Sequence, residues 1–128
     1  MLRLGKQKEE LGVIFDQLGT PTYARDLAKT CLEILCGGIS VNISENGNLY
    51  HYSNEGKISW LEFANYIKHF CNFTTQINGI IIEEYLTSAK RPKYSLLNKT
   101  KINETYKVKI PNYKVSLEKC IKILQNDK

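Results

Sequence analysis

The sequence has no apolar run long enough to cross a bilayer, because a membrane-spanning helix needs about 20 consecutive apolar residues. Its first four residues, Met-Leu-Arg-Leu, lack the apolar region of a secretory signal peptide. We therefore expect a cytoplasmic protein and no membrane partner.

The four cysteines form no Cys-x-x-Cys pair, and no histidine lies near them at the spacing of a zinc site. We therefore expect no metal centre and no disulfide framework. Each cysteine falls within an apolar helical pattern, where we expect a small buried hydrophobic side chain. The four are Cys31, Cys36, Cys71 and Cys120.

Acidic residues are scarce in the last third of the chain. Residues 90–128 hold eleven Lys or Arg against three Asp or Glu, whereas residues 1–89 hold seven against ten. This asymmetry can indicate a nucleic-acid partner. The basic residues are dispersed, however, without a dense run or interleaved aromatics, so a solvated lysine-rich surface is the favoured interpretation, with no nucleic-acid partner.

The 128 residues, 42% hydrophobic and 24% charged, suit one modest soluble domain with a single core. Segments of strand and helix pattern alternate along the chain, which favours an α/β architecture. We expect one domain over residues 1–128.

The stretch around residues 16–28 organises this pattern. The β-branched and aromatic residues 13–15 predict a strand, and Pro21 lies where a helix would begin. Thr20 or Thr22 would cap that helix, and Gly37 would end it. A strand, a polar turn and a helix N-terminus together suit an anionic or polyhydroxyl ligand, although an ordinary connection has the same pattern.

Later elements are predicted by local signals. Ser59 and Glu62 have the spacing of a capping box before a helix whose aromatic stripe should face the core. Asn112 could cap a final helix. The remaining expected elements are a short helix near the N-terminus, strands at 49–52, 77–82 and 95–97, and a helix at 100–106.

Two further features are candidates for chemistry. His51 lies between two tyrosines in an expected strand, and we interpret it as a packed core residue. Arg91 precedes Pro92, which holds it extended, and a planar guanidinium suits bidentate contact with phosphate oxygens. A surface arginine before a turn would have the same sequence.

Three ordered motifs resemble one family. Residues 16–28 read Asp-Gln-x-Gly-Thr-Pro-Thr-Tyr-x-x-Asp-Leu-Ala, residues 50–56 read Tyr-His-Tyr-Ser-Asn-Glu-Gly, and residues 90–95 read Lys-Arg-Pro-Lys-Tyr-Ser. These motifs are similar to segments in the C-terminal part of dTDP-4-dehydrorhamnose reductases, which are atypical extended short-chain dehydrogenases. The resemblance covers nearly the whole chain.

The resemblance implies a small mixed α/β lobe that binds a sugar nucleotide, without the N-terminal Rossmann core. The family's full-length enzymes reduce dTDP-6-deoxy-L-lyxo-4-hexulose to dTDP-L-rhamnose with NADPH or NADH. Such a reductase needs a glycine-rich cofactor turn and a Tyr-x-x-x-Lys pair. The sequence contains neither, so we expect an inactive fragment that binds no cofactor and holds no catalytic residue.

By the same resemblance, Gln17, Thr20 and Thr22 would contact the dTDP-sugar, and Arg91 would contact its diphosphate, with Lys90 as a weaker candidate. The expected partners are this ligand and the missing Rossmann domain, and a homo-oligomer is possible. The alternative is a non-catalytic interaction subunit, because the family also resembles the regulatory subunit of methionine adenosyltransferase.

Overall fold

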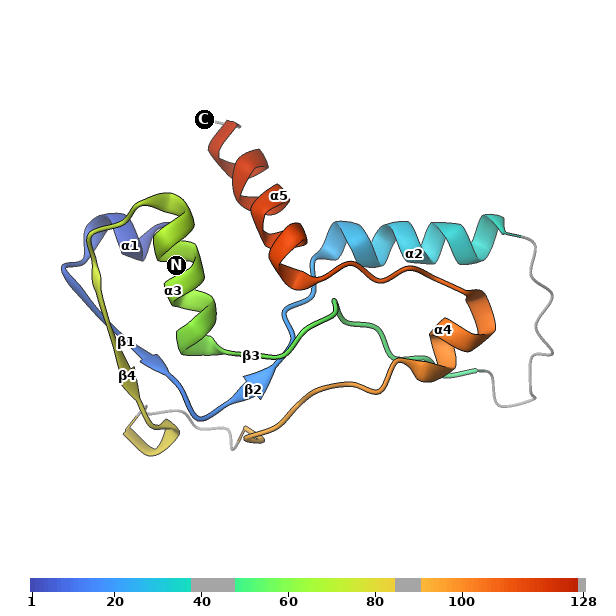
Figure 1. Cartoon of the computed structure of the whole chain (residues 1–128), viewed down its shortest axis with the longest axis horizontal. Helices are drawn as coiled ribbons and strands as arrows, with labels where there is room; N and C mark the ends of the chain where they lie inside the picture. The colour runs from blue at the N-terminus through green and yellow to red at the C-terminus, as the bar shows by residue number, and fades with distance from the viewer. Residues whose placement is uncertain (38–47, 85–90, 127–128) are drawn as a thin grey trace. The chain divides into compact units, whose positions relative to one another are not determined.

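The computed structural model describes residues 1–37, 48–84 and 91–126, and divides the chain into two compact units (Figure 1). Unit 1 consists of Met1–Gly19 and Lys57–Leu96. Unit 2 consists of Thr20–Gly56 and Leu97–Lys128. Helices and strands occur together, which confirms the mixed α/β class.

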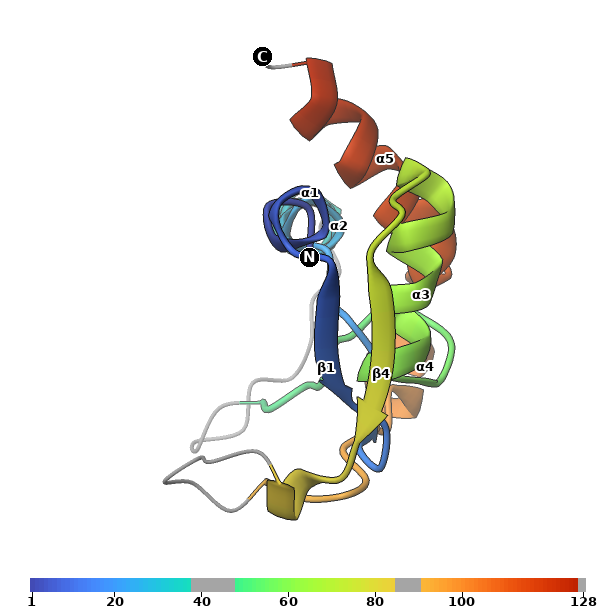
Figure 2. The same cartoon turned by 90° about the vertical axis from the view of Figure 1, so that its left-hand side faces the viewer.

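Unit 1 is built on a parallel strand pair. Strand β1 (Glu10–Ile14) pairs with β4 (Gln76–Ile80), and the register places Leu11 beside Ile77. A two-residue antiparallel pair, β2 (Leu18–Gly19) with β3 (Ile58–Ser59), follows the end of β1. Helix α3 (Trp60–Cys71) packs against both β1 and β4 (Figure 2). The predicted strands at 13–15 and 77–82 are thus confirmed, each shifted toward its N-terminus.

Helix α3 begins at the predicted capping box. The Ser59 hydroxyl accepts a hydrogen bond from the Glu62 backbone N–H at 3.2 Å, and the Glu62 carboxylate accepts from the Ser59 N–H at 2.8 Å. Ala64 and Ile67 are the buried residues of this helix. Trp60, in contrast, is 50% exposed, so the prediction that the whole aromatic stripe faces the core was wrong. Its ring meets Phe63 edge-on at the surface.

Short elements complete unit 1. Helix α1 (Leu4–Gln7) is held through Gly5, whose carbonyl accepts from the Thr75 hydroxyl at 2.6 Å. The 3₁₀ turn η1 (Ile82–Glu84) follows β4. The predicted strand at 95–97 does not form, because only the neighbouring Tyr94 makes an isolated bridge, to Leu18.

Unit 2 contains three helices within the described residues: α2 (Ala24–Cys36), α4 (Thr100–Tyr106) and α5 (Tyr113–Asn126). Its buried apolar residues are Ile102, Tyr113 and Ile121. Asn112 caps α5 as predicted, since its side-chain oxygen accepts from the Lys114 N–H at 3.0 Å. The helices at 100–106 and after Asn112 are therefore confirmed.

The predicted strand at 49–52 is absent from unit 2, and so is the buried position of His51. Tyr50 instead packs edge-on against Tyr106, with the Lys101 ammonium 4.8 Å from the Tyr50 ring centre. Within the described residues, no neighbouring strand is available to pair with residues 49–52. The first β-bridge after them is at Glu55, with Asn112. His51 is consequently exposed.

The cysteines also depart from expectation. All four lie on helices, but Cys31 and Cys36 on α2 are exposed, and Cys71 and Cys120 are half-buried. Helical spacing placed them correctly on helices, whereas burial depends on what packs against each helix.

Candidate functional site

The C-terminal ends of β1 and β4 converge on a polar cluster in unit 1. The Asp16 carboxylate accepts from the Ile82 N–H at 3.2 Å and lies 3.3 Å from the Lys93 ammonium. Glu83 lies 3.7 Å from the same ammonium. Ligands of α/β proteins commonly bind beyond the carboxyl ends of parallel strands. This end of unit 1 is therefore a suitable position for a binding site.

Backbone pairing joins two predicted segments at this place. The Leu18 N–H donates to the Lys93 carbonyl at 2.8 Å, and the Ser95 N–H donates to the Leu18 carbonyl at 2.9 Å. The chain around Gln17 therefore runs beside the chain that follows Arg91. Leu18 and Lys93, which lie 75 positions apart in the sequence, are thus adjacent within one compact unit.

Gln17 is a buried polar side chain with an unused donor. It is 5% exposed, and its amide nitrogen has no hydrogen-bond partner. A buried unpaired donor costs about 1–3 kcal/mol, so such a group is usually completed by water or a ligand. Arg91 is exposed, and Lys90 lies outside the described residues. Gln17 and Arg91 remain the predicted ligand contacts of unit 1.

The two threonines differ from the sequence-based expectation of a helix cap. The Thr20 hydroxyl donates to the Gly56 carbonyl within unit 2, and Thr22 is exposed. Neither caps α2, and Pro21 precedes the helix. Tyr23 occupies the N-cap position without a side-chain cap, because its backbone N–H donates instead to the Asn54 side-chain oxygen at 2.8 Å.

Asn54 is the centre of a buried network in unit 2 that sequence reasoning did not assign. It is fully buried, and its amide nitrogen lies 2.7 Å from the Asp26 carboxylate and 3.0 Å from the Ser116 hydroxyl. The same nitrogen donates to the Pro111 carbonyl at 3.2 Å. Asp26 also accepts from the Ser116 hydroxyl. The position lies within the motif at 50–56, but only the fold reveals its partners.

The protonation of two side chains is shifted by these surroundings. The hydrogen bond to Asp16, together with Glu83, raises the pKa of Lys93 and keeps its ammonium charged. Burial raises the pKa of Tyr52, which the Thr30 hydroxyl opposes and the charge of Asp26 reinforces. Lys93 is exposed but engaged by carboxylates, whereas Arg91 is exposed and makes no ion pair with the residues that the structure describes.

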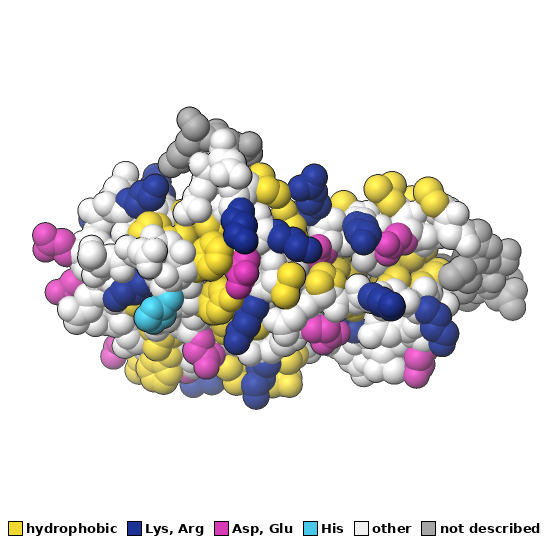
Figure 3. Space-filling model, turned by 45° about the horizontal axis from the view of Figure 1, so that its top comes forward, with side chains coloured by type: hydrophobic (Ala, Val, Ile, Leu, Met, Phe, Trp, Pro, Cys, Tyr) yellow, Lys and Arg dark blue, Asp and Glu magenta, His cyan; other side chains and the backbone are white. Residues whose placement is uncertain are grey.

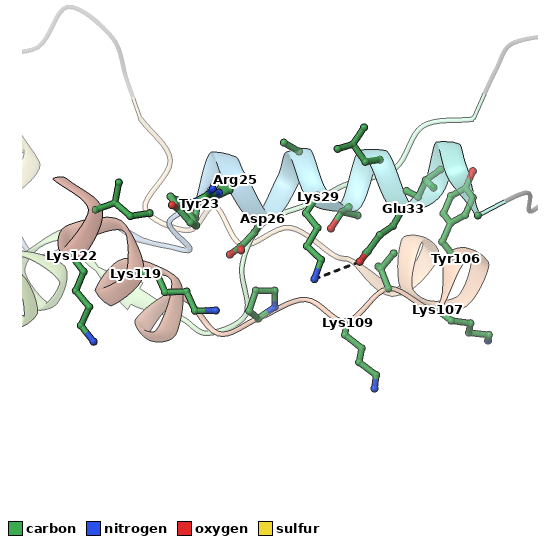
Figure 4. A pocket seen from close by; sticks show the side chains of 18 residues that line it. Tyr23, Arg25, Asp26, Lys29, Glu33, Tyr106, Lys107, Lys109, Lys119 and Lys122 are labelled. Atoms are coloured by element: carbon green, nitrogen blue, oxygen red, sulfur yellow. Dashed lines mark ion pairs between the residues drawn. The ribbon is translucent and has the colours of Figure 1, made fainter. Parts of the chain in front are cut away.

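A groove of about 1170 Å³ lies in unit 2, between α2, residues 106–111 and α5 (Figure 4). Six basic and two acidic side chains line it, and Lys29 pairs with Glu33 at 3.6 Å. The basic ones are Arg25, Lys29, Lys107, Lys109, Lys119 and Lys122. The groove contains none of the predicted contact residues, so its charge is a separate feature of the surface.

Residues 1–37, 48–84 and 91–126 contain neither a metal-ligand cluster nor a membrane-spanning helix. No cluster of three His, Cys, Asp or Glu side chains in these ranges could hold a metal ion. The helices of the same ranges are all too short or too polar to span a membrane.

Comparison with known proteins gives a consistent result. The sequence model of a family described as the RmlD substrate binding domain matches residues 1–126. The spore coat polysaccharide biosynthesis protein SpsK of Bacillus subtilis (strain 168) is 38% identical over 81% of this chain and 34% of its own length.

Two solved structures extend the similarity to the fold. A dTDP-4-dehydrorhamnose reductase from Clostridium acetobutylicum superimposes with a TM-score of 0.85 at 33% identity, over 97% of this chain and 42% of that one. The reductase from Bacillus anthracis, solved in complex with NADP, gives a TM-score of 0.77 at 32% identity, over 91% of this chain and 38% of its own. The chain thus spans less than half the length of these relatives.

Proposed function

The chain belongs to the family of the RmlD substrate binding domain, and on that premise we propose that it is the sugar-nucleotide-binding part of a dTDP-4-dehydrorhamnose reductase. The complete protein would reduce the 4-keto group of dTDP-6-deoxy-L-lyxo-4-hexulose and give dTDP-L-rhamnose. This part would bind the nucleotide sugar and orient it, which lowers the barrier by fixing the geometry of the reacting groups.

One observation carries the proposal: the pairing of Leu18 with residues 93–95 sets two family motifs side by side at the end of the β1–β4 pair. Gln17 would use its unpaired amide nitrogen on a ligand oxygen. Arg91 would contact the diphosphate, for which its forked guanidinium is suited. Thr22 of unit 2 is exposed and stays a predicted contact, whereas Thr20 of the same unit would have to give up its bond to Gly56.

The nicotinamide cofactor would supply the hydride, and we assign its binding to the remaining part of the longer protein. This chain's residues do not fit that role, because its sequence contains no Gly-x-Gly-x-x-Gly or Gly-x-x-Gly-x-x-Gly turn. None of its eight tyrosines is followed by lysine four residues later, so the acid of the reduction would also lie elsewhere. The chain alone would be inactive.

The alternative, an interaction subunit that resembles the regulatory subunit of methionine adenosyltransferase, gains no support from these relatives. They are a polysaccharide biosynthesis protein and reductases.

Calorimetric titration of the chain with dTDP-L-rhamnose tests the proposal. We expect saturable binding, and Arg91→Ala should weaken it by about 1.5–3 kcal/mol because charge-assisted hydrogen bonds are lost. Arg91→Lys should restore only part of the affinity, since lysine cannot bind bidentately. Arg3→Ala, an exposed arginine of the same unit, is the matched control and should leave the affinity unchanged.

Each negative outcome has a defined meaning. Equal affinities of Arg91→Ala and Arg3→Ala would remove Arg91 from the site. The absence of any heat of binding at two well-separated temperatures would contradict ligand recognition by this part of the protein on its own.

A further inference from the structure

Two polar residues of helix α2 face inward, whereas Arg25, Lys29 and Glu33 of the same helix are exposed. Asp26 joins the buried Asn54 network, and Thr30 is 5% exposed. Both lie on one side of the helix, four residues apart. The side of α2 that packs within unit 2 is therefore held by hydrogen bonds.

The opposite side of α2 is apolar and exposed. Leu27 is 38% exposed, and Leu35 is 78% exposed. Figure 3 shows hydrophobic side chains at the surface along this helix. The exposed apolar face is defined by Ala24, Leu27, Ala28, Cys31 and Leu35, which recur at helical spacing.

On a typical surface helix the apolar stripe faces the core, whereas on α2 the apolar stripe faces outward. A continuous apolar stripe in water is unfavourable and typically marks a surface that another molecule or domain covers. Leu32, 61% exposed, extends the apolar area beside the stripe. The face therefore needs an occupant.

The length comparison identifies that occupant. The chain covers 42% of the Clostridium acetobutylicum reductase and 34% of SpsK, so most of each relative lies outside the matched part. A second copy of the chain is a poorer occupant, because each copy has a net charge of +5. Two chains that both carry this net charge repel each other.

We propose that the exposed apolar face of α2 is the docking surface for the remaining part of the longer polypeptide, which covers it with an apolar surface of its own. The inference rests on family membership and on the geometry of α2. It does not depend on which ligand unit 1 binds.

Cys31 provides a direct probe, since it lies on the face and is exposed. In the isolated chain, a small thiol reagent should label Cys31 and Cys36 rapidly, and half-buried Cys71 slowly, because burial raises the pKa of that thiol. The comparison protein joins residues 1–128 to the part of the Clostridium acetobutylicum reductase outside the match. In that protein, we expect the rapid labelling of Cys31 to be lost.

Leu35→Lys tests the same contact by disruption. In the joined protein it should restore rapid labelling of Cys31 and lower the melting temperature, whereas the control Leu124→Lys, an exposed leucine of α5, should do neither. Cys31 labelling that is equally rapid in the joined and isolated proteins would overturn the proposal.

The isolated chain gives an independent arm that does not require the joined protein to fold. Leu35→Lys should leave its melting temperature unchanged, and sedimentation should show a monomer with concentration-independent labelling of Cys31. A lowered melting temperature would show that the face is packed within this chain. Protection of Cys31 that grows with concentration would make a second copy the occupant. Either result would overturn the proposal.

Discussion

At the scale of single residues, Asn54 has the widest consequences, because its side chain connects segments that lie far apart in the sequence. One buried amide satisfies the N-terminus of α2, the Asp26 carboxylate, the Ser116 hydroxyl and the Pro111 carbonyl. Buried polar networks stabilise only when every member is satisfied, because an unpaired member costs more than a bond contributes. Asn54 should therefore be intolerant of substitution.

Asn54→Ala should lower the free energy of unfolding by about 1–3 kcal/mol, since it leaves buried groups of the network unpaired. Asn54→Asp should cost more near pH 7, because a second carboxylate would then meet Asp26 at 2.7 Å. Urea unfolding across pH measures both effects. Asn98→Asp is the control, since this exposed asparagine accepts from the Thr100 N–H through an oxygen that aspartate retains.

The pH dependence of Asn54→Asp has a defined sign. The introduced carboxyl group would be buried beside Asp26, which raises its pKa in the folded state. The folded variant therefore binds a proton more tightly than the unfolded chain. The loss in free energy of unfolding, relative to the wild type, should therefore shrink as pH falls through that raised pKa toward the ordinary value for aspartate, about 3.9. A deficit that is independent of pH would show that the two carboxylates do not interact.

At the scale of elements, the capping box of α3 makes a separate prediction. Ser59→Ala should lower the free energy of unfolding by about 1 kcal/mol, because the Glu62 N–H loses its acceptor. Thr22→Ala should change little, since Thr22 is exposed and does not cap α2. Equal losses in the two variants would contradict this assignment of the caps.

The same element has a pH response. Hydrogen bonds from the Ser59 backbone and hydroxyl lower the pKa of Glu62 below its ordinary value of 4.5. Because the folded-state pKa is depressed, this stabilisation is present above 4.5 and is lost as pH falls through the folded value. Urea unfolding of the wild type and Glu62→Gln should therefore differ more near pH 7 than below about pH 3. A constant difference would indicate that charge is not involved.

Elements governed by local signals were predictable from the sequence. The capping box before α3, the β-branched run of β4 and the Asn112 cap of α5 all depend on residues within a few positions of one another. The start of α2 was not predictable, because its acceptor, Asn54, lies 31 residues away. The exposure of Cys31 and Cys36 was missed for the same reason. The apolar spacing of α2 is visible in the sequence, but distant residues decide which side of the helix packs against the rest of unit 2.

The candidate site was predictable in part. The motifs at 16–28 and 90–95 suggest Gln17 and Arg91, which stay predictions, and the structure places Leu18 beside residues 93–95. The engagement of Lys93 by Asp16 and Glu83 was not foreseen, because it requires the ends of β1 and β4 to meet. Lys90 lies outside the described residues.

At the scale of the whole molecule, the chain should not bind NADPH at a defined site, since its sequence contains no glycine-rich cofactor turn. Titration monitored by nicotinamide fluorescence should show no saturable change at moderate salt. A weak response that disappears as salt is raised would come from nonspecific attraction to the basic groove. A salt-resistant, saturable response would place cofactor binding in this part of the protein.

The two compact units are interleaved, because the chain passes from one to the other after Gly19, Gly56 and Leu96. Unit 1 therefore cannot be completed during synthesis until residue 96 has left the ribosome, and unit 2 must wait for the last helix. Until then β1 lacks its partner strand and α2 lacks the α5 side of its hydrogen-bonded network. While residues 15–75 are being synthesised, β1 thus has no β4 to pair with, and exposed unpaired strands make a nascent chain prone to aggregation.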